Sequence, residues 1–259
     1  MRLSEFHGRH ILITGGSTGI GLATARLLAR RDARVFLLAR NRANLSEAAE
    51  SIAQAGGTAA HRAVDVSKRE ELLAAIETAE CTFGPVTGLF ANAAMGGGFA
   101  SLLDYEEDLF DAMLRTNLTS IFWAIKRVLP GMIAKRSGSI VVTGSLASER
   151  GMPNNVGYVA SKHAVLGLAR AAAVEAAPHG VRVNCVLPGL IETPMLMQLD
   201  SSGSQAIRDR LGKAVPLGRI GAAEEVAEMV SFLLSDSASH ITAQSMAVDG
   251  GILGTLVPR

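Results

Sequence analysis

The sequence predicts an α/β fold in which a doubly wound parallel sheet carries helices on both faces. Short runs of β-branched and aliphatic residues alternate with longer, amphipathic, Ala/Leu-rich segments, as in successive βαβ units. The short runs are apolar throughout, which is typical of strands that are covered on both faces. The residues able to carry chemistry come directly after these runs. That is the sheet edge at which such folds bind ligands.

Seven short segments have the composition of strands, because Val, Ile, Leu, Phe or Ala fills most of their positions. Glycine, asparagine or charged residues flank them and mark turns. In chain order these predicted strands are His10–Thr14, Arg34–Leu38, Thr58–Val64, Gly88–Ala91, Ser139–Thr143, Val181–Leu187 and Ser245–Val248.

Six longer segments repeat apolar residues at the spacing of an amphipathic helix. The fourth of them is unusually long, and the polar pair Thr116 and Asn117 predicts a break within it. In chain order these predicted helices are Gly19–Arg31, Leu45–Ala55, Arg69–Glu80, Tyr105–Ala134, Gly157–Ala177 and Glu224–Leu234.

Composition excludes several classes of protein. The 259 residues are 48% hydrophobic and 19% charged, which is too apolar for a disordered chain. A formal net charge of +1 gives no sign of a nucleic-acid or acidic-membrane partner. Cys81 and Cys185 are too few for a disulfide framework or a four-cysteine zinc site, and the histidines lack metal-ligand spacing. We therefore expect no metal and a reducing, cytoplasmic location.

The two ends of the chain and its longest uncharged stretch bear on targeting. That stretch, Cys81–Leu103, contains five glycines and a proline, so we expect no membrane span. The first nine residues mix charges and lack an apolar run, so we expect no signal peptide. Residues 256–259, Leu-Val-Pro-Arg, resemble part of a thrombin-cleaved tag, and we expect a tag remnant there. One domain over residues 1–255 is the resulting prediction.

A glycine-rich loop follows the first predicted strand and opens the first predicted helix. Glycines permit a tight turn and close approach of a pyrophosphate, which the free N–H groups and positive end of the helix would bind. An ordinary strand–helix turn is the alternative, but the position in the chain favours a Rossmann-type dinucleotide site. No Lys-Ser or Lys-Thr follows, which argues against a P-loop. The residues expected at the phosphates are Gly15, Ser17, Thr18, Gly19, Ile20 and Gly21.

The end of the second predicted strand indicates which dinucleotide is bound. NAD sites usually place Asp or Glu about 20 residues beyond the glycines, where it holds the ribose 2′-OH. Here Ala39 stands in that place and Arg40 follows it. A guanidinium suits a 2′-phosphate, so we predict NADP(H) over NAD(H). The alternative is that Arg40 and Arg42 only form a solvated face.

Three side chains that could move a proton lie near the fifth predicted strand. Ser145 follows that strand, and Tyr158 and Lys162 lie one helical turn apart at the start of the next helix. A nearby ammonium favours the phenolate, so we expect the pKa of Tyr158 to lie below about 10. Such a tyrosine can exchange a proton with an alcohol or ketone oxygen.

Together these motifs resemble the short-chain dehydrogenase/reductase family, in its single-domain branch of about 250 residues. The resemblance covers essentially the whole chain and implies a homotetramer built on helical faces and the last strand. In the order of the family, the residues that carry it are the glycine loop 14–21, Asp65, Val66, Asn92, Ala93, Asn117, Ser145, Tyr158, Lys162, Pro188 and Gly189.

The resemblance implies a role for each catalytic residue. Tyr158 would be the general acid in carbonyl reduction and the base in alcohol oxidation, and Ser145 would polarise the substrate oxygen. Lys162 would lower the pKa of Tyr158 and hold the nicotinamide ribose. Asn117 would break its helix and keep a water that links Lys162 to solvent. Hydride transfer itself would belong to the nicotinamide.

The resemblance also implies further contacts with the cofactor. Asp65 and Val66 would contact adenine, and Asn92 would lie on the adenosine side. Beyond Pro188 and Gly189, the carboxamide would be bound by Ile191 and Thr193.

Two departures from the family pattern bear on cofactor binding. Ala94 stands where the family often has a glycine, so the local backbone or the seating of the cofactor can differ. Thr18 stands in the region where many NADP members carry a basic residue. Arg40 is therefore the main argument for NADP.

Three loops should surround the nicotinamide, namely Met95–Phe99, Leu146–Val156 and Leu190–Leu211. Their apolar side chains predict an apolar ketone or secondary alcohol, although the methionines could equally be core. Glu149 and Arg150 could instead face a polar substrate or solvent. We expect Gln198–Ser204 to be a lid that orders on substrate binding. The expected pocket residues are Leu146, Met152, Met195 and Leu196.

The leading hypothesis is therefore an NADP(H)-dependent carbonyl reductase or alcohol dehydrogenase. An NAD-linked alcohol or diol dehydrogenase is the alternative within the same class. A non-catalytic dinucleotide-binding sensor is the alternative of another class, against which the complete set of Asn117, Ser145, Tyr158 and Lys162 argues.

Overall fold

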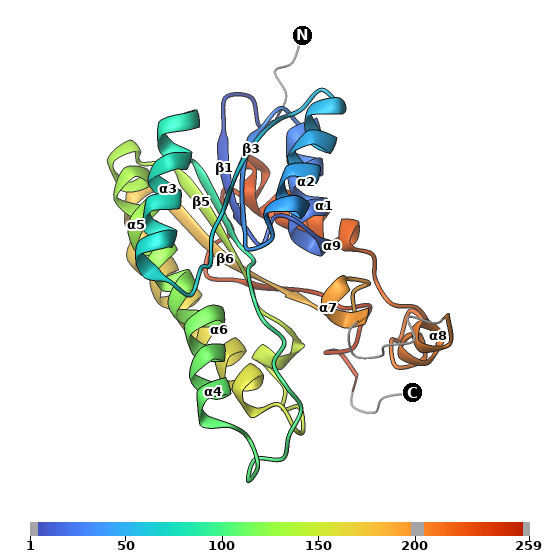
Figure 1. Ribbon diagram of the computed structural model, residues 1–259. Helices are drawn as coiled ribbons and strands as arrows, with labels where there is room; N and C mark the ends of the chain where they lie inside the picture. The colour runs from blue at the N-terminus through green and yellow to red at the C-terminus, as the bar shows by residue number, and fades with distance from the viewer. Residues whose placement is uncertain (1–4, 198–204, 256–259) are drawn as a thin grey trace.

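A parallel sheet forms the centre of the computed structural model, in which we describe residues 5–197 and 205–255 (Figure 1). Within those residues the sheet has seven strands in the order β3-β2-β1-β4-β5-β6-β7, and every pair is parallel. The strand order reverses between β1 and β4, which makes the sheet doubly wound, as predicted. The strands are β1 His10–Thr14, β2 Arg34–Ala39, β3 Thr58–Ala63, β4 Gly88–Ala91, β5 Gly138–Thr143, β6 Val181–Pro188 and β7 Ser245–Val248.

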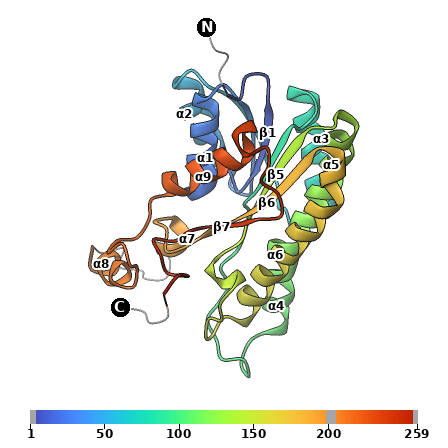
Figure 2. The same cartoon turned by 180° about the vertical axis from the view of Figure 1, so that it is seen from behind.

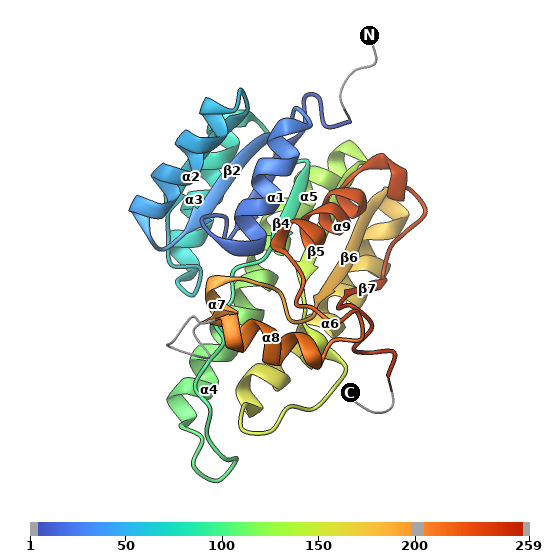
Figure 3. The same ribbon diagram turned by 90° about the vertical axis from the view of Figure 1, so that its right-hand side faces the viewer.

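Helices cover both faces of the sheet, as Figure 2 shows from behind. The main ones are α1 Gly19–Arg30, α2 Arg42–Gln54, α3 Arg69–Phe83, α4 Glu107–Leu114, α5 Ser120–Lys135, α6 Val156–Ala176 and α9 Ala223–Leu234. Two more, α7 Pro194–Met197 and α8 Gln205–Lys213, lie across the end of the sheet at which the strands finish (Figure 3). The short 3-10 helices are η2 Leu146–Ser148, η3 Ala177–His179 and η4 Asp236–Ala238.

Alternate residues of the strands build two separate cores. In β1, Leu12 packs with residues of α3, α5 and α6, whereas Ile11 and Ile13 pack with residues of α1, α2 and α9. All three side chains are fully buried. The uninterrupted apolar run of the strand follows from this arrangement, because a strand between two helical layers has no solvent-facing side.

Most predicted elements are found, with ends that shift by a few residues. The predicted helix Tyr105–Ala134 is corrected, because it consists of α4, a π-helical turn η1 Arg115–Thr119, and α5, with no break between them. The helix α7 lies within the predicted loop Leu190–Leu211, and α8 begins within it and ends at Lys213. The charged sequence QAIRDRLGK of α8 has no apolar pattern that would predict a helix. The expected lid at 198–204 and tag remnant at 256–259 lie outside the described residues.

A histidine is buried at the start of β1. The His10 side chain is fully buried, and its Nδ1 lies 2.7 Å from the carbonyl oxygen of Gly84, while its Nε2 has no partner among the described residues. Burial lowers the pKa of His10 below its ordinary value of 6.5, although the Gly84 carbonyl opposes this shift. The imidazole is therefore neutral in the folded protein at pH 7.

We expect this neutral histidine to make stability depend on pH. The unfolded chain binds a proton at His10 more readily, so its contribution is complete above pH 6.5 and is lost as the pH falls below that value. Urea unfolding between pH 7 and pH 5 should show a free energy that falls by up to about 1.4 kcal/mol per pH unit more in the wild type than in His10→Asn. Equal slopes for the two proteins would contradict this.

Candidate active site

The glycine loop between β1 and α1 is shaped to receive an anion. The N–H groups of Gly15 and Gly16 donate to the carbonyl of Leu38, which bends the loop against β2. The N-cap residue Thr18 makes no side-chain cap, and the first turn of α1 holds no acidic residue. Among the described residues, the backbone N–H groups of 17–20 have no hydrogen-bond partner. The positive end of α1 is therefore free to bind phosphate.

Close packing explains the glycines of this loop. A Cβ on Gly21 would lie 2.0 Å from the carbonyl oxygen of Gly15, and one on Gly15 would lie 2.9 Å from the Cα of Ala93. Gly15 also has a φ of +67°. Side chains at these positions would force the loop away from the sheet edge.

Two charged residues face each other where β2 and β3 end. Arg40 is exposed, directly after β2, and its positive charge acts on Asp65, which follows β3. Partial burial opposes ionisation of Asp65, but hydrogen bonds from the Ser67 side chain and backbone, together with Arg40 and Lys68, hold its pKa below the ordinary value. This edge therefore offers one carboxylate and one guanidinium at the positions predicted for the adenosine half of a dinucleotide. Val66, beside Asp65, is buried.

Asn92 fastens three strand ends together. Its Nδ2 donates to the carbonyl of Gly15 at 3.2 Å, and its Oδ1 accepts from the hydroxyl of Thr143 at 3.1 Å. Its backbone N–H donates to the hydroxyl of Thr14 at 3.0 Å. The side chain thus joins the ends of β1, β4 and β5. Its predicted contact with adenosine stays a prediction.

Ser145, Tyr158 and Lys162 come together at the end of β5. The hydroxyl of Ser145 lies close enough to that of Tyr158 to lower its pKa. The Nζ of Lys162 donates to the carbonyl of Thr143, the last residue of β5, at 2.8 Å and lies 5.6 Å from the centre of the Tyr158 ring. The sequence-predicted trio therefore shares one site.

Burial shifts the pKa values of Tyr158 and Lys162. It raises the pKa of Tyr158 above 10, and the nearby hydroxyl of Ser145 only partly offsets that rise. Burial also lowers the pKa of Lys162 to about 8. The prediction that the pKa of Tyr158 lies below 10 is therefore wrong for this structure, because desolvation of the phenolate outweighs the attraction of an ammonium that is itself desolvated. Tyr158 is a phenol at neutral pH.

Asn117 lies in the π-helical turn η1 and is fully buried. Its Oδ1 accepts from the N–H of Met95 at 2.8 Å, and its Nδ2 lies 3.0 Å from the carbonyl of Met95 and 3.1 Å from the hydroxyl of Ser161. The side chain holds the loop after β4 against α6. The predicted helix break is instead a widened turn, a form that is frequent at functional sites. The predicted water relay to Lys162 stays a prediction.

The segment after β6 crosses over the glycine loop. Ile191, buried, pairs with Gly221, and a Cβ on Gly19 would lie 3.2 Å from the Cγ2 of Thr193. A Cβ on Gly96 would lie 3.6 Å from the Cγ of Met195. The segment therefore reaches from the loop after β1 to the loop after β4. Pro188 ends β6, and Gly189 donates its N–H to Val248.

Of the four predicted pocket residues, Met195 and Leu196 lie on α7, Leu146 opens η2, and Met152 lies in the loop before α6. Met195 is 41% exposed and the other three are half-buried. The polar alternative is weaker, because Glu149 accepts from the hydroxyl of Ser245 and Arg150 donates to the carbonyl of Leu253.

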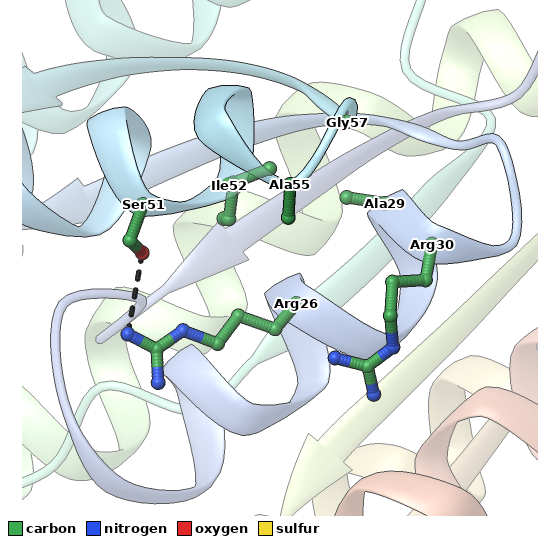
Figure 4. Close-up of a pocket in the computed structure, with 7 residues that line it drawn as sticks. All are labelled: Arg26, Ala29, Arg30, Ser51, Ile52, Ala55 and Gly57. Atoms are coloured by element: carbon green, nitrogen blue, oxygen red, sulfur yellow. Dashed lines mark hydrogen bonds between the residues drawn. The ribbon is translucent and has the colours of Figure 1, made fainter.

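A separate hollow opens between α1 and α2, and Figure 4 shows the side chains around it. Gly57 lies directly before β3, so the hollow is at the opposite edge of the sheet from Ser145, Tyr158 and Lys162. Arg26 donates to the hydroxyl of Ser51 across it. The lining residues are Arg26, Ala29, Arg30, Ser51, Ile52, Ala55 and Gly57.

Neither a metal cluster nor a membrane span is found in the part of the chain that the structure describes. There, no group of three or more His, Cys, Asp or Glu residues is placed to hold a metal ion. No helix of residues 5–197 and 205–255 is long and apolar enough to cross a bilayer.

Comparison with known proteins identifies similar sequences and structures. Residues 15–253 match the family described as enoyl-(acyl carrier protein) reductase. Cyclohexanol dehydrogenase from Acinetobacter sp. (strain SE19) is 36% identical over 95% of this chain and 96% of its own length.

Two solved structures are close in fold. An actinorhodin polyketide ketoreductase variant with NADPH has a TM-score of 0.90 and 35% identity, over 97% of this chain and 99% of that one. An NAD+-bound xylitol dehydrogenase has a TM-score of 0.89 and 34% identity, over 95% of this chain and 100% of that one.

We expect Lys162→Met to stabilise the fold. Methionine has a similar length but no charge to desolvate, so the free energy of unfolding at pH 7 should rise by roughly 2 kcal/mol, after allowance for the hydrogen bond lost at Thr143. Urea unfolding measures this change. Lys135→Met, at an exposed position, is the control and should change stability little. A destabilised Lys162→Met protein would show that the interactions of the buried ammonium stabilise the fold by more than its desolvation destabilises it.

Proposed function

The chain belongs to the short-chain dehydrogenase/reductase family, and on that premise we propose that it is an NADP(H)-dependent carbonyl reductase and alcohol dehydrogenase. One observation carries the proposal. A protonated phenol, Tyr158, lies next to the hydroxyl of Ser145 and beside the ammonium of Lys162. The three groups stand at the sheet edge that also holds the uncapped N-terminus of α1.

The residues present fit a nicotinamide dinucleotide. The free N–H groups of 17–20 suit its pyrophosphate, and the glycines leave room for it against the sheet. Asp65, Val66 and Asn92 line the adenosine side. Gly189, Ile191 and Thr193, on the segment that crosses over the loop, would hold the carboxamide end. When bound, the cofactor supplies a hydride to the carbonyl carbon of the substrate.

The side chains of the trio supply the proton. In reduction, the Oη of Tyr158 gives its proton to the carbonyl oxygen as the carbon gains the hydride, so that a ketone becomes a secondary alcohol. The raised pKa keeps this proton on Tyr158 at neutral pH. In oxidation the phenolate must form first, which favours a more alkaline pH. Ser145 orients the oxygen, and the charge of Lys162 stabilises the phenolate.

The walls of the site favour an apolar ketone or secondary alcohol. Leu146, Met152, Met195 and Leu196 contribute apolar surface, and methionines adapt to irregular shapes. Glu149 and Arg150 are held by the C-terminal segment rather than directed at substrate. Cyclohexanol, the substrate in the name of one relative, is an alcohol of this class.

The choice of NADP(H) rests on Arg40. Ala39 leaves the ribose 2′-oxygen without a carboxylate partner, and Arg40 is exposed beside that position. NAD(H) is the second candidate, because Thr18 supplies no basic group and a close structural neighbour is bound to NAD+. The attraction between Arg40 and Asp65 also draws the guanidinium toward β3.

We further propose a homotetramer in the cytoplasm. Phe122 on α5 and Val174 on α6 are 44% and 69% exposed, which leaves apolar surface on the helices that the family resemblance assigns to subunit contacts. Cys81 and Cys185 are unpaired thiols, as suits a reducing compartment.

Tyr158→Phe tests the proposed function. Loss of the phenolic proton should lower kcat for ketone reduction by about 100-fold or more, with NADPH affinity within about threefold of wild type. The measurements are turnover on a panel of ketones and alcohols and cofactor binding by fluorescence. Near-normal turnover in the variant would mean that another residue is the acid. A wild-type protein that binds NADPH but turns over no ketone or alcohol would favour the sensor hypothesis.

Ala39→Asp tests the cofactor. The new carboxylate should hydrogen-bond the 2′-OH of NADH and repel the 2′-phosphate, which shifts the ratio of the two dissociation constants toward NADH by about 10-fold or more. In the same fluorescence assay, Arg40→Ala should weaken NADPH alone. Arg42→Ala is the matched control for a merely solvated arginine. Tighter binding of NADH than of NADPH by the wild type would refute the assignment.

A further inference from the structure

A loop that follows β4 crosses the N-terminal end of the helix that carries Tyr158. We call residues 95–105 the crossing loop. The carbonyl of Gly96 accepts from the Nδ2 of Asn155 at 3.0 Å, and the N–H of Ala100 donates to the carbonyl of Asn154 at 2.9 Å. At its far end, the hydroxyl of Tyr105 meets the first turn of α6. The loop therefore contacts this helix end at several points.

The cap of α6 comes from this loop rather than from the helix itself. Asparagine at an N-cap usually accepts from a backbone N–H of the first turn, but Asn155 makes no such bond. Instead the hydroxyl of Tyr105 lies beside the backbone N–H of Gly157 in this first turn. That hydroxyl in turn donates to the Oδ1 of Asn155 at 3.5 Å. Asn155 is 1% exposed, and both the oxygen and the nitrogen of its side-chain amide make hydrogen bonds with the crossing loop.

Two glycines make room for the phenol of Tyr105. A Cβ on Gly157 would lie 2.8 Å from the Tyr105 hydroxyl, and one on Gly97 would lie 3.3 Å from it and 2.0 Å from the methyl of Met113. Gly97 also has a φ of +74°. Any side chain at Gly157 would displace the ring that caps the helix.

We propose that Tyr105 and Asn155 are positioning residues, which together hold the first turn of α6 and the crossing loop so that the Tyr158 hydroxyl faces substrate. This inference rests on the proposed function. Tyr158 lies three residues after Asn155 and one after Gly157, so a shift of that turn moves the phenol directly. Met95 and Gly96, which border the substrate site beside Met195, would move with it.

The titration of Tyr158 reports on this role without any turnover. Lys162 from its own helix and Ser145 from the end of β5 face the phenol, and burial raises its pKa. Loosening the first turn would admit water and let the pKa fall. The chain has two tyrosines, so NMR of isotope-labelled tyrosine gives two titrations, and Tyr105→Phe assigns them.

The experiment compares Asn155→Ala, Tyr105→Phe and Gly157→Ala with wild type. In each variant the pKa of Tyr158 should fall by about one pH unit. In turnover assays, kcat should fall about 10-fold, with dinucleotide affinity within about twofold. Asn155→Ala combined with Tyr105→Phe should be little worse than either alone, because the two act through one connection.

Two variants serve as matched controls. Gly167→Ala makes the same change in the same helix at a position where a Cβ has nothing within 4 Å, so it should alter neither the titration nor turnover. Ser101→Ala removes a hydrogen bond to Asp104 at the tip of the crossing loop and should be equally silent.

An unchanged Tyr158 titration in folded Asn155→Ala and Gly157→Ala proteins would overturn the inference and leave these residues a structural role only. A wild type without turnover would refute the proposed function alone, because the titration still decides whether Tyr105 and Asn155 position the phenol.

Discussion

The burial of one ammonium group, that of Lys162, is the constraint on which the site depends. Removing it from water lowers its pKa to about 8, and the carbonyl of Thr143 is its hydrogen-bond acceptor. The last residue of β5 must therefore direct its carbonyl at Lys162. The helix α6 must begin at a point that places its second turn, which carries Lys162, opposite that carbonyl. Burial of Tyr158 in the same site raises the pKa of its phenol and keeps it protonated at neutral pH.

The edge of the sheet gathers residues that are far apart in sequence. Asn92 follows β4; its backbone N–H donates to the hydroxyl of Thr14 at the end of β1, and its side chain accepts from the hydroxyl of Thr143 at the end of β5. These hydrogen bonds fix the positions of the loops after β1, β4 and β5 relative to one another. Because the segment with Thr193 then lies over Gly19, a ligand at this edge would be enclosed by backbone from both halves of the chain.

Sequence was sufficient where a local pattern decides the structure. The predicted strands His10–Thr14, Gly88–Ala91 and Ser245–Val248 match the structure to the residue. Helices cover both faces of the first two, which gives them continuous apolar runs, and turn residues mark the ends of all three. Spacing also placed Tyr158 beside Lys162. The direction of the Tyr158 pKa was missed, since spacing does not show burial. Tyr105 and Asn155 were missed because their contact depends on how two loops fold together. An asparagine just before the predicted helix is the only sequence signal at this place, and it does not show a contact with Tyr105.

The π-helical turn of residues 115–119 determines what the deletion of a residue from this part of the chain would do. It holds one residue more than a regular α-helix would need between α4 and α5. An α-helix completes a turn in about 3.6 residues and this widened turn takes about one more, so deletion of a single residue there would restore a regular α-helix and leave α4 and α5 in nearly the same relative rotation. The side chains of the turn itself would change direction, and the contacts of Asn117 with Met95 and Ser161 would be lost. The extra residue of this span is therefore tied to the contacts that hold the loop after β4 against α6.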